Sequence, residues 1–570
     1  MSPQAGPPLT VPSALSPLLD AAWLRGGCLF VWLASFTNAA VNLTKRFQTG
    51  LLFFVAFNIQ AAEPEYDLVV RHGRIADGTG NPTFHADLAV KDGRIAGIGT
   101  IAGKGKQEFD ATGLVVAPGF IDVHTHAEDI DDRPQAENFL HLGVTTLILG
   151  NCGSSALNVG QFFSELEQLT ISPNVATLIG QGTVRGRAMR GSFDRPPTDE
   201  ELAQMKEFVK RGMEDGAIGL STGLIYLPGV FAKTEELIEL AKVAAAYGGI
   251  YATHQRNESA EIVQSLEEIF RIAREAKIRA EISHLKLSGP ANWGKASEIL
   301  ALIDRARAEG LDITQDQYLY TASSTGLSQL IPESMREGGK AKFIERLNTP
   351  ETKTQMFDSM KKTLLKRQSA DYAYAVIASC KADPTLNGLN VPEAARQMRG
   401  ADSLDDQIET ILEIEKNGGA TGVFHGMSEA DLETFARHPN TMFASDSGVR
   451  RFQVDVPHPR GYGNNARLLG VYVREKGVLR LEDAIRKMTS LPARTFHLRE
   501  RGELREGYWA DLAIFDPADV VDHSTYKDPH HYSTGMRYVL VNGTVVIDHD
   551  QHTGARPGKT LPHGAPMPSH

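Results

Sequence analysis

The sequence predicts an α/β protein in which a closed (β/α)8 barrel carries a small β domain. Two observations support this fold class. Short apolar segments alternate with helical patterns through the middle of the chain, which is typical of parallel strands joined by helical crossovers. Strand–turn–strand patterns stand near both ends of the chain. With 570 residues, the chain is long enough for one large barrel and a smaller unit.

The composition is that of an ordinary globular protein. Hydrophobic residues make up 42% of the chain and charged residues 23%, which argues against global disorder. A formal net charge of -11, without a clustered Lys/Arg stripe, argues against a nucleic-acid partner. The three cysteines, Cys28, Cys152 and Cys380, are too few for a disulfide framework, so we expect at least one to have another use.

Residues 1–62 are expected to form a leader rather than part of the fold. Lys45-Arg46, the apolar residues 51–59 and Gln60-Ala-Ala62 match the basic, apolar and cleavage regions of a signal peptide. The apolar run is shorter than the roughly 20 residues that span a bilayer, so we expect no stable membrane span in the mature chain. The leader predicts export, to the periplasm of a bacterium, and a cytoplasmic location if it is not used.

The position of this signal peptide suggests where translation begins. A signal peptide begins near the start of a chain, yet Lys45 lies well inside this one. We therefore expect translation to begin near Val41 or Leu43, against the alternative of a non-cleaved anchor or a disordered leader. Amino-terminal sequencing of the native protein tests this: a mature start just after Ala62 is expected, and a start near residue 1 contradicts it.

Residues 63–117 and 500–550 are predicted to form one small β domain from both ends of the mature chain. Residues 67–75 and 87–95 are alternating apolar runs broken by a His-Gly or Asp-Gly turn, the signature of a β-hairpin. Residues 511–515 and 538–547, the second broken by Asn-Gly, repeat the pattern near the other end. The alternative is two separate hairpins packed on the barrel. Residues 551–570 are expected to be a C-terminal tail.

Residues 118–499 are predicted to form the barrel. The candidate strands are residues 120–126, 145–152, 174–180, 216–222, 249–254, 279–285, 311–318 and 441–446. Before the fourth strand, Thr198-Asp-Glu-Glu201 forms a capping box that predicts the start of a helix. Residues 328–440 interrupt the alternation with polar helical sequence and are expected to be an insertion, since such insertions are often lids or binding loops.

The first candidate strand, Phe120-Ile-Asp-Val-His-Thr-His126, ends in two histidines one residue apart. Alternate side chains of a strand point to the same face, so His124 and His126 can reach one ion together. Two histidines cannot complete the four-ligand shell of zinc, so further ligands are required from elsewhere. The alternative for an isolated pair is two histidines with ordinary structural hydrogen bonds.

Four more potential ligands end other candidate strands. Cys152 ends the second strand, His254 the fifth, His284 the sixth and Asp446 the last. The carboxyl ends of barrel strands meet at one mouth, where the active sites of such barrels lie. Each residue alone is a weak signal, because a buried cysteine or a strand-end histidine is often only structural. Together they predict a metal centre.

These motifs resemble those of the amidohydrolase superfamily, and within it those of the D-aminoacylase group, the N-acyl-D-amino-acid deacylases. The resemblance covers roughly residues 63–550. It is carried by Gly119-Phe-Ile-Asp-Val-His-Thr-His126, Gly150-Asn-Cys-Gly153, Thr253-His-Gln-Arg-Asn-Glu258, Ser283-His-Leu-Lys286, Asp316-Gln-Tyr-Leu-Tyr320, Ala444-Ser-Asp446 and His458-Pro-Arg460. It implies a distorted (β/α)8 TIM-like barrel with a small β-sandwich domain.

The resemblance also implies roles for the candidate ligands. One metal position would take His124, His126 and Asp446, and the other, tightly binding and filled by zinc, would take Cys152, His254 and His284. Asp446 would also be the catalytic base. Relatives such as dihydroorotase and hydantoinase bridge two metals with a carboxylated lysine, whereas residues 219–223 contain no lysine here.

Four further residues are expected to bind the substrate. Arg460 matches the arginine that pairs with the substrate carboxylate, for which a guanidinium supplies two parallel hydrogen bonds. Tyr318 and Ser324 match substrate-binding positions, and Lys286 follows His284 on the same strand face. Structural roles for these four residues are the alternative. Ala127-Glu128, Gln255 and Asn464-Asn465 depart from the group's usual residues, which leaves the acyl and side-chain preference open.

The implied activity is zinc-dependent hydrolysis of an N-acyl-D-amino acid, a small-molecule substrate, to a carboxylic acid and a free D-amino acid. A dipeptidase that acts on peptides with a C-terminal D-residue is an alternative, because such peptides offer the same groups. Other amidohydrolases of cyclic or linear substrates are a further alternative. A catalytically inactive scaffold is disfavoured because such descendants usually lose ligands, and all six residues are present.

Overall fold

The computed structural model describes residues 64–191 and 193–564. The predicted leader, residues 1–62 with its signal peptide, lies outside these ranges. Within them, no helix is both long enough and apolar enough to cross a membrane.

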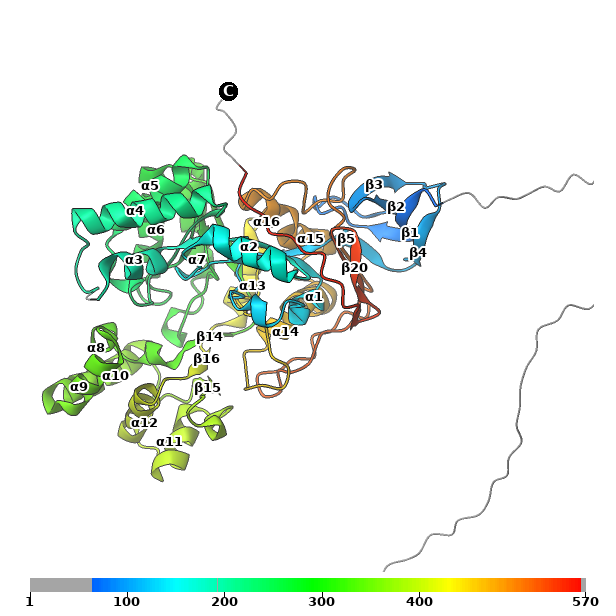
Figure 1. The fold of residues 1–570 in the computed structure, drawn as a ribbon. Coiled ribbons are helices and arrows are strands. Elements are labelled where there is room, and N and C mark those ends of the chain that lie inside the picture. The colour runs from blue at the N-terminus through cyan, green and yellow to red at the C-terminus, as the bar shows by residue number, and fades with distance from the viewer. Residues whose placement is uncertain (1–63, 192, 565–570) are drawn as a thin grey trace, which may run out of the picture. The chain divides into compact units, whose positions relative to one another are not determined.

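Eight parallel strand positions form the barrel, as the alternation of apolar and helical segments predicts (Figure 1). One three-stranded sheet has the order β6-β7-β8, and the other barrel sheet runs β17-β13-β12-β11-β10-β9. The third position spans both sheets, since β8 and β9 are separated by one residue. The bounds are β6 Phe120–Asp122, β7 Val144–Leu149, β8 Asn174–Thr177, β9 Ile179–Gly180, β10 Gly219–Gly223, β11 Ile250–His254, β12 Arg279–Ile282, β13 Ile313–Gln317 and β17 Thr441–Phe443.

The barrel closes between its first and last strands through residues that follow both. Thr125 and Ser447 form a parallel bridge, Asp446 donates its backbone N–H to the His124 carbonyl at 2.9 Å, and His126 donates to the Ser447 carbonyl at 2.8 Å. The ladder is therefore interrupted but the circle is complete. This confirms the distorted (β/α)8 fold class.

Amphipathic helices cover the barrel. In α4, the predicted capping box is confirmed: Thr198 Oγ1 accepts from the Glu201 N–H at 3.2 Å, and Glu201 accepts from the Thr198 N–H at 2.8 Å. Met205, Val209 and Met213 of its apolar face are buried. The helices of this layer are α1 Glu137–Leu140, α2 Val159–Leu169, α3 Gln181–Met189, α4 Asp199–Glu214, α5 Thr234–Ala246, α6 Ile262–Ala276, α7 Ala296–Ala308, α13 Glu429–Arg437, α14 Arg460–Arg467, α15 Leu481–Met488 and α16 Ser490–Thr495.

Strands from both ends of the chain share one nine-stranded sheet. The two halves join where β5 pairs antiparallel with β18, and Figure 1 shows the early strands (blue) beside the late ones (red). The strands are β1 Tyr66–Ile75, β2 Phe84–Lys91, β3 Arg94–Gly99, β4 Gly105–Asp110, β5 Val115–Pro118, β18 Leu512–Phe515, β19 Met536–Val541, β20 Thr544–Asp548 and β21 Gln551–His552. The predicted small β domain is therefore built from both ends.

One of the predicted hairpins is wrong. Residues 67–75 belong to the single strand β1, whose register against β2 shifts between Val70 and Gly73. His72 has a left-handed φ of 57°, and a side chain at Gly73 would come within 2.6 Å of Val116 Cγ2. The His-Gly pair therefore makes a β-bulge rather than a turn. The hairpins β2–β3 and β19–β20 are confirmed.

An inserted domain follows β13, and we define it as residues 322–426. It contains the sheet β14-β16-β15 and a hydrophobic core of its own. Its elements are β14 Ala322–Gly326, α8 Glu333–Arg336, α9 Gly339–Asn348, α10 Pro350–Arg367, β15 Ala375–Ser379, α11 Val391–Arg399, α12 Leu404–Lys416 and β16 Thr421–His425. The predicted bounds of 328 and 440 were too late at both ends: β14 pairs with β16, and α13 contacts α7 of the barrel layer.

The predicted tail is also ordered against the barrel as far as residue 564. Val175 of β8 donates its backbone N–H to the Lys559 carbonyl at 2.9 Å, and Leu561 donates to the Val175 carbonyl at 2.8 Å. The segment thus adds a short parallel bridge beside β8. Its composition, rich in Gly and Pro, conceals this pairing.

Candidate metal centre

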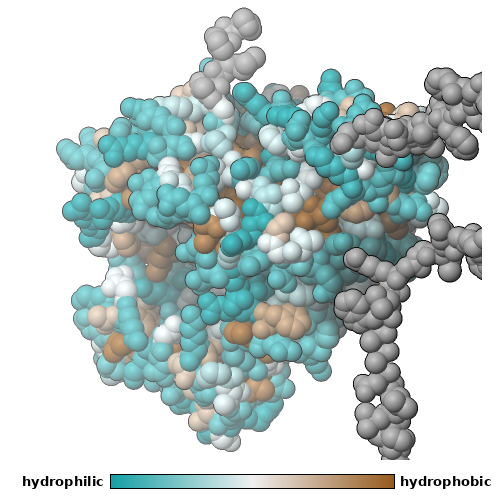
Figure 2. Space-filling model, turned by 45° about the vertical axis from the view of Figure 1, so that its right-hand side comes forward, coloured by the Kyte–Doolittle hydropathy of each residue, from teal (hydrophilic) through white to brown (hydrophobic). Residues whose placement is uncertain are grey.

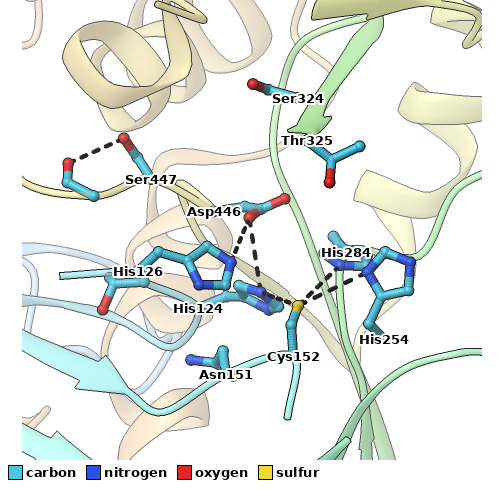
Figure 3. A network of polar contacts seen from close by, with 12 residues as sticks. His124, His126, Asn151, Cys152, His254, His284, Ser324, Thr325, Asp446 and Ser447 are labelled. Atoms are coloured by element: carbon cyan, nitrogen blue, oxygen red, sulfur yellow. Dashed lines mark hydrogen bonds and ion pairs between the residues drawn. The ribbon is translucent and has the colours of Figure 1, made fainter. Parts of the chain in front are cut away.

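All six predicted ligands lie together at the carboxyl end of the barrel (Figure 3). His124 and His126 follow β6, Cys152 follows β7, His254 ends β11, His284 follows β12 and Asp446 follows β17. The strands bring them together because parallel strands of a barrel share one mouth.

The distances place Cys152 at the middle of the cluster. Its Sγ lies 3.3 Å from His124 Nε2, 3.8 Å from His254 Nδ1 and 3.8 Å from His284 Nε2. Asp446 Oδ1 lies 3.2 Å from His126 Nε2 and 3.7 Å from His124 Nε2. Donor atoms lie within 4.8 Å of one another in three groups: His124, His126 and Cys152; Cys152, His254 and His284; and His124, His284 and Asp446.

Three of these residues have backbone conformations that side chains rarely adopt. The φ angles are 52° at Cys152, 39° at His284 and 50° at Asp446. Each such residue costs on the order of 1–3 kcal/mol and persists only where its surroundings hold it. At Cys152 the preceding Asn151 provides one such hold, because its amide donates to the Ile148 carbonyl at 2.9 Å. The left-handed turn after the strand directs the side chain into the mouth.

The negative charges of Cys152 and Asp446 and the positive charge of the neighbouring histidines stabilise one another. Burial alone would raise the pKa of the Cys152 thiol, but the charge and hydrogen bonds of the neighbouring histidines hold it well below its usual value. Burial would lower the pKa of His126, yet Asp446 and Cys152 raise it to about 10. A thiolate beside imidazoles is therefore the stable form, and the thiolate is the form of cysteine that binds metal.

Asp446 is held in its ionised form by its neighbours. Burial opposes its ionisation, but Arg460 and His126 hold its pKa well below the usual value. Arg460 Nη1 lies 2.8 Å from Asp446 Oδ2. Its Nε is buried without a hydrogen-bond acceptor among the described residues. Arg460 thus retains a donor for another anion.

A buried carboxylate stands behind two of the histidines. Glu258 Oε1 lies 3.0 Å from His284 Nδ1, and its Oε2 lies 3.8 Å from His254 Nε2. In both rings the opposite nitrogen faces Cys152. Lys286 balances the charge of Glu258 at 2.6 Å and also lies 2.7 Å from His284 Nδ1. Glu258 is therefore placed to orient the His284 ring, whereas its 3.8 Å contact with His254 Nε2 is too long for a hydrogen bond. Lys286 is engaged with Glu258 and His284.

A second buried carboxylate stands behind the first-strand histidine. Asp316 Oδ2 lies 3.5 Å from His124 Nδ1, and Asp316 Oδ1 accepts the backbone N–H of His284 at 3.0 Å. The 3.5 Å contact is not a hydrogen bond, since neither His124 Nδ1 nor Asp316 Oδ2 has a hydrogen-bond partner among the described residues. Asp316 thus lies beside the His124 ring, in the place from which carboxylates commonly orient metal-binding imidazoles.

The donor set fits zinc. Zinc prefers cysteine thiolate, neutral imidazole and carboxylate ligands, and these are the groups that converge here. Cys152 Sγ lies 3.8 Å from His254 Nδ1 and 3.8 Å from His284 Nε2. These distances suit ligands that surround one metal ion better than direct hydrogen-bond partners.

Three of the four predicted substrate-binding residues line a cavity of about 550 Å³ beside the cluster: Tyr318, Ser324 and Lys286. Arg460 does not line it, but its guanidinium carbon lies 4.5 Å from the centre of the Tyr318 ring. A second cavity of about 520 Å³ lies against His126 and Cys152. Tyr226, Ser324, Thr325 and Asp446 line both cavities, so the candidate centre lies between two spaces.

Sequence reasoning missed several residues of this site. Tyr226 lies over the His254 ring, with centroids 5.1 Å apart, and its hydroxyl lies 3.0 Å from Thr325 Oγ1. Its position three residues after β10 is the only sequence signal for it. Glu258 and Asp316 stand inside the motifs Thr253–Glu258 and Asp316–Tyr320. Their partners come from neighbouring strands, and sequence spacing does not reveal such contacts.

A (β/α)8 barrel with histidine, cysteine and aspartate donors at its carboxyl end defines a metal-centred class of barrel protein. Comparison with known families refines this class. The chain matches the amidohydrolase family over residues 107–315 and 386–547, and it belongs to that family.

Relatives resemble nearly the whole described chain. It is 35% identical to a D-aminoacylase of Alcaligenes xylosoxydans xylosoxydans, over 88% of this chain and 99% of that one. The structure of N-acyl-D-glutamate deacylase from Bordetella bronchiseptica, complexed with zinc and a phosphonate mimic of the tetrahedral intermediate, is 34% identical. That match covers 88% of this chain and 100% of that one, with a TM-score of 0.75. A D-aminoacylase structure described for its binuclear metal centre is 32% identical, covers 87% and 100% of the two chains, and has a TM-score of 0.75.

Replacement of Glu258 by glutamine is expected to weaken zinc binding while preserving the fold. The amide cannot supply a carboxylate to His254 and His284, and loss of such partners typically costs about 10- to 100-fold in metal affinity. Competition with a chelator measures the affinity, and the visible spectrum of the cobalt-substituted protein should shift. The matched control is Glu261→Gln, an exposed carboxylate of the same cavity. Equal zinc affinity in the two variants would contradict the orienting role of Glu258.

Proposed function

We propose that this protein is a zinc-dependent hydrolase that cleaves the amide bond of N-acyl-D-amino acids. The products are a carboxylic acid and a free D-amino acid. The observation that carries the proposal is the convergence of the six donors at the barrel mouth beside Arg460, whose Nε lacks a hydrogen-bond acceptor among the described residues. The similarity to D-aminoacylase and N-acyl-D-glutamate deacylase supports the substrate class.

Two metal positions fit the donors. Cys152, His254 and His284 would hold the tight zinc, because a soft thiolate and two oriented imidazoles form a closed triad. His124, His126 and Asp446 would hold a second, weaker ion. The zinc of the deacylase structure and the binuclear centre named for D-aminoacylase support this arrangement. Zinc, when bound, makes hydroxide available at neutral pH and polarises a carbonyl oxygen.

Asp446 would move the proton in both directions. Its carboxylate is held ionised by Arg460 and His126, so it is in the basic form at neutral pH. It accepts the proton of the attacking water and then donates that proton to the leaving amine. The pairing with Arg460 also fixes where Oδ1 stands relative to His126.

Arg460, Tyr318 and Ser324 would position the substrate. The free donor of Arg460 would take the α-carboxylate of the amino acid, and the Tyr318 ring supports the guanidinium at 4.5 Å. Holding the carboxylate and the scissile amide at separate points selects one face of the chiral carbon. Lys286 would contact the substrate from the wall of the same cavity, where its Nζ also pairs with Glu258.

A hydrolysis panel tests the proposal directly. The panel contains N-acyl-D-amino acids, their L enantiomers and L-D dipeptides, with zinc content measured on the same preparation. We expect hydrolysis of the D enantiomers, because Arg460 orients only one hand of the substrate. Faster cleavage of the L-D dipeptides would favour the dipeptidase alternative. A zinc-free protein without amidase activity would support the inactive scaffold and overturn the proposal.

Replacement of Asp446 by asparagine is expected to separate proton transfer from binding. Asparagine keeps the shape but cannot act as a base, and general acid–base groups contribute about 10² to 10⁴-fold in rate. We expect a loss of kcat at the upper end of that range, because Asp446 serves in both proton transfers. Zinc bound by Cys152, His254 and His284 should remain, as metal analysis would show. Turnover within about threefold of wild type, against that expectation, would mean that another residue is the base.

A further inference from the structure

One wall of the 550 Å³ cavity comes from the inserted domain rather than from the barrel. Thr363, Lys366 and Arg367 of the last turn of α10 line it, together with aromatic residues of the same domain, Tyr372, Tyr374 and Phe424. His254, His284 and Asp446 line the same cavity from the barrel. A substrate held at the candidate metal centre can therefore extend to α10. Figure 2 shows the surface hollowed between the barrel helices above and the inserted domain below.

Arg367 is the unusual residue of this wall. Its guanidinium carbon lies 3.9 Å from the centre of the Tyr374 ring, and its Nη2 donates to the His425 carbonyl at 2.9 Å. Its Nε is buried without a hydrogen-bond acceptor among the described residues. Burial lowers the pKa of the guanidinium, and no carboxylate is among the groups that oppose this effect.

Several buried or half-buried arginines of the described chain have carboxylate partners. Arg185 pairs with Glu236, Arg256 with Glu268 and Arg501 with Asp511. This is the expected pattern, because a charge taken out of water is costly unless an opposite charge compensates it. Within the described ranges, Arg367 has no such carboxylate at salt-bridge distance.

The carboxylates of the cavity wall do not supply the missing charge. Glu258 is paired with Lys286 at 2.6 Å, and Asp446 is paired with Arg460 at 2.8 Å. Glu261 and Glu333 are exposed to solvent. The positive charge at the end of α10 is therefore available to a ligand that enters the cavity.

We propose that Arg367 binds a carboxylate that the substrate carries away from the scissile amide, so that the enzyme prefers N-acyl-D-amino acids with a second acidic group. This inference rests on the proposed function and narrows its substrate class. A planar guanidinium stacked on an aromatic ring presents fixed donors, and carboxylates are their natural partners. The second carboxylate has two sources, the side chain of the D-residue or the far end of the acyl group.

Two pairs of substrates distinguish these sources. N-acetyl-D-glutamate is compared with N-acetyl-D-glutamine, and N-glutaryl-D-alanine with its neutral terminal amide. The wild type is expected to hydrolyse the charged member of one pair with a kcat/KM about 10- to 100-fold higher, because hydrogen bonds to charged groups are the strong ones. The pair that shows the preference identifies which end of the substrate reaches Arg367.

The variant Arg367→Gln then tests the residue. The ratio of kcat/KM for the charged member to that for the neutral member should fall about 10-fold or more, chiefly through KM, because binding is lost rather than chemistry. The matched control is Lys362→Gln, which removes an exposed positive charge from the same helix without touching the cavity. Two results would overturn the proposal. One is a wild type that prefers neither member of either pair, and the other is an Arg367→Gln variant whose kcat/KM falls equally for the charged and the neutral member.

Binding of glutarate separates this inference from the proposed function. If no substrate of either pair is hydrolysed, the proposed function fails, and calorimetric titration of the zinc-loaded protein with glutarate decides the role of Arg367. Glutarate binding that weakens about 10-fold or more in Arg367→Gln but not in Lys362→Gln supports an anion subsite. Equal binding by wild type and Arg367→Gln, or none by the wild type, overturns it.

Discussion

Two backbone hydrogen bonds hold the candidate metal centre together. They join His124 to Asp446 and His126 to Ser447, at 2.9 Å and 2.8 Å, beyond the ends of the first and last barrel strands. Without them, a histidine pair from the start of the barrel would not face a carboxylate from its end. Because the donors meet only in the closed barrel, a ligand that binds all of them stabilises that closure. The fold and the metal centre are therefore linked thermodynamically, and the left-handed backbone at Asp446 is held by the same contact.

Three buried charges of the candidate centre each lie beside groups of opposite charge. The Cys152 thiolate lies among imidazoles, Asp446 faces Arg460, and Glu258 faces Lys286. Such pairs are needed because a lone charge in a low-dielectric interior costs several kcal/mol, on the order of its lost hydration. Glu258 and Asp316 also lie behind histidines whose other nitrogens face the centre, Glu258 at 3.0 Å from His284 and Asp316 at 3.5 Å from His124. Electrostatic balance and ligand orientation thus come from the same residues.

The sequence predicted the features that depend on local residue patterns. It did not predict the features that depend on pairing between strands or between side chains far apart in the chain. The strand positions and the six donors followed from apolar runs that end in polar residues. The bulge at His72 was mistaken for a turn, because a turn and a bulge both use a left-handed residue before glycine. The inserted domain begins earlier than predicted because β14 is too polar to be recognised without β16 beside it. The partnership of Glu258 with His284 was likewise hidden, since it joins residues that follow two neighbouring strands, β11 and β12.

The candidate metal centre and part of the cavity wall beside it come from different parts of the chain. The barrel supplies the six donors and Arg460, whereas Ser324 and Thr325 of β14 and the last turn of α10 belong to the inserted domain. A hydrophobic core separate from that of the barrel lets this domain change its cavity residues without moving the strand ends. Relatives with different names, D-aminoacylase and N-acyl-D-glutamate deacylase, match this chain almost equally well. Such uniform similarity is expected if the metal-binding barrel is shared and a few residues facing the cavity select the substrate, because those few side chains contribute little to overall identity.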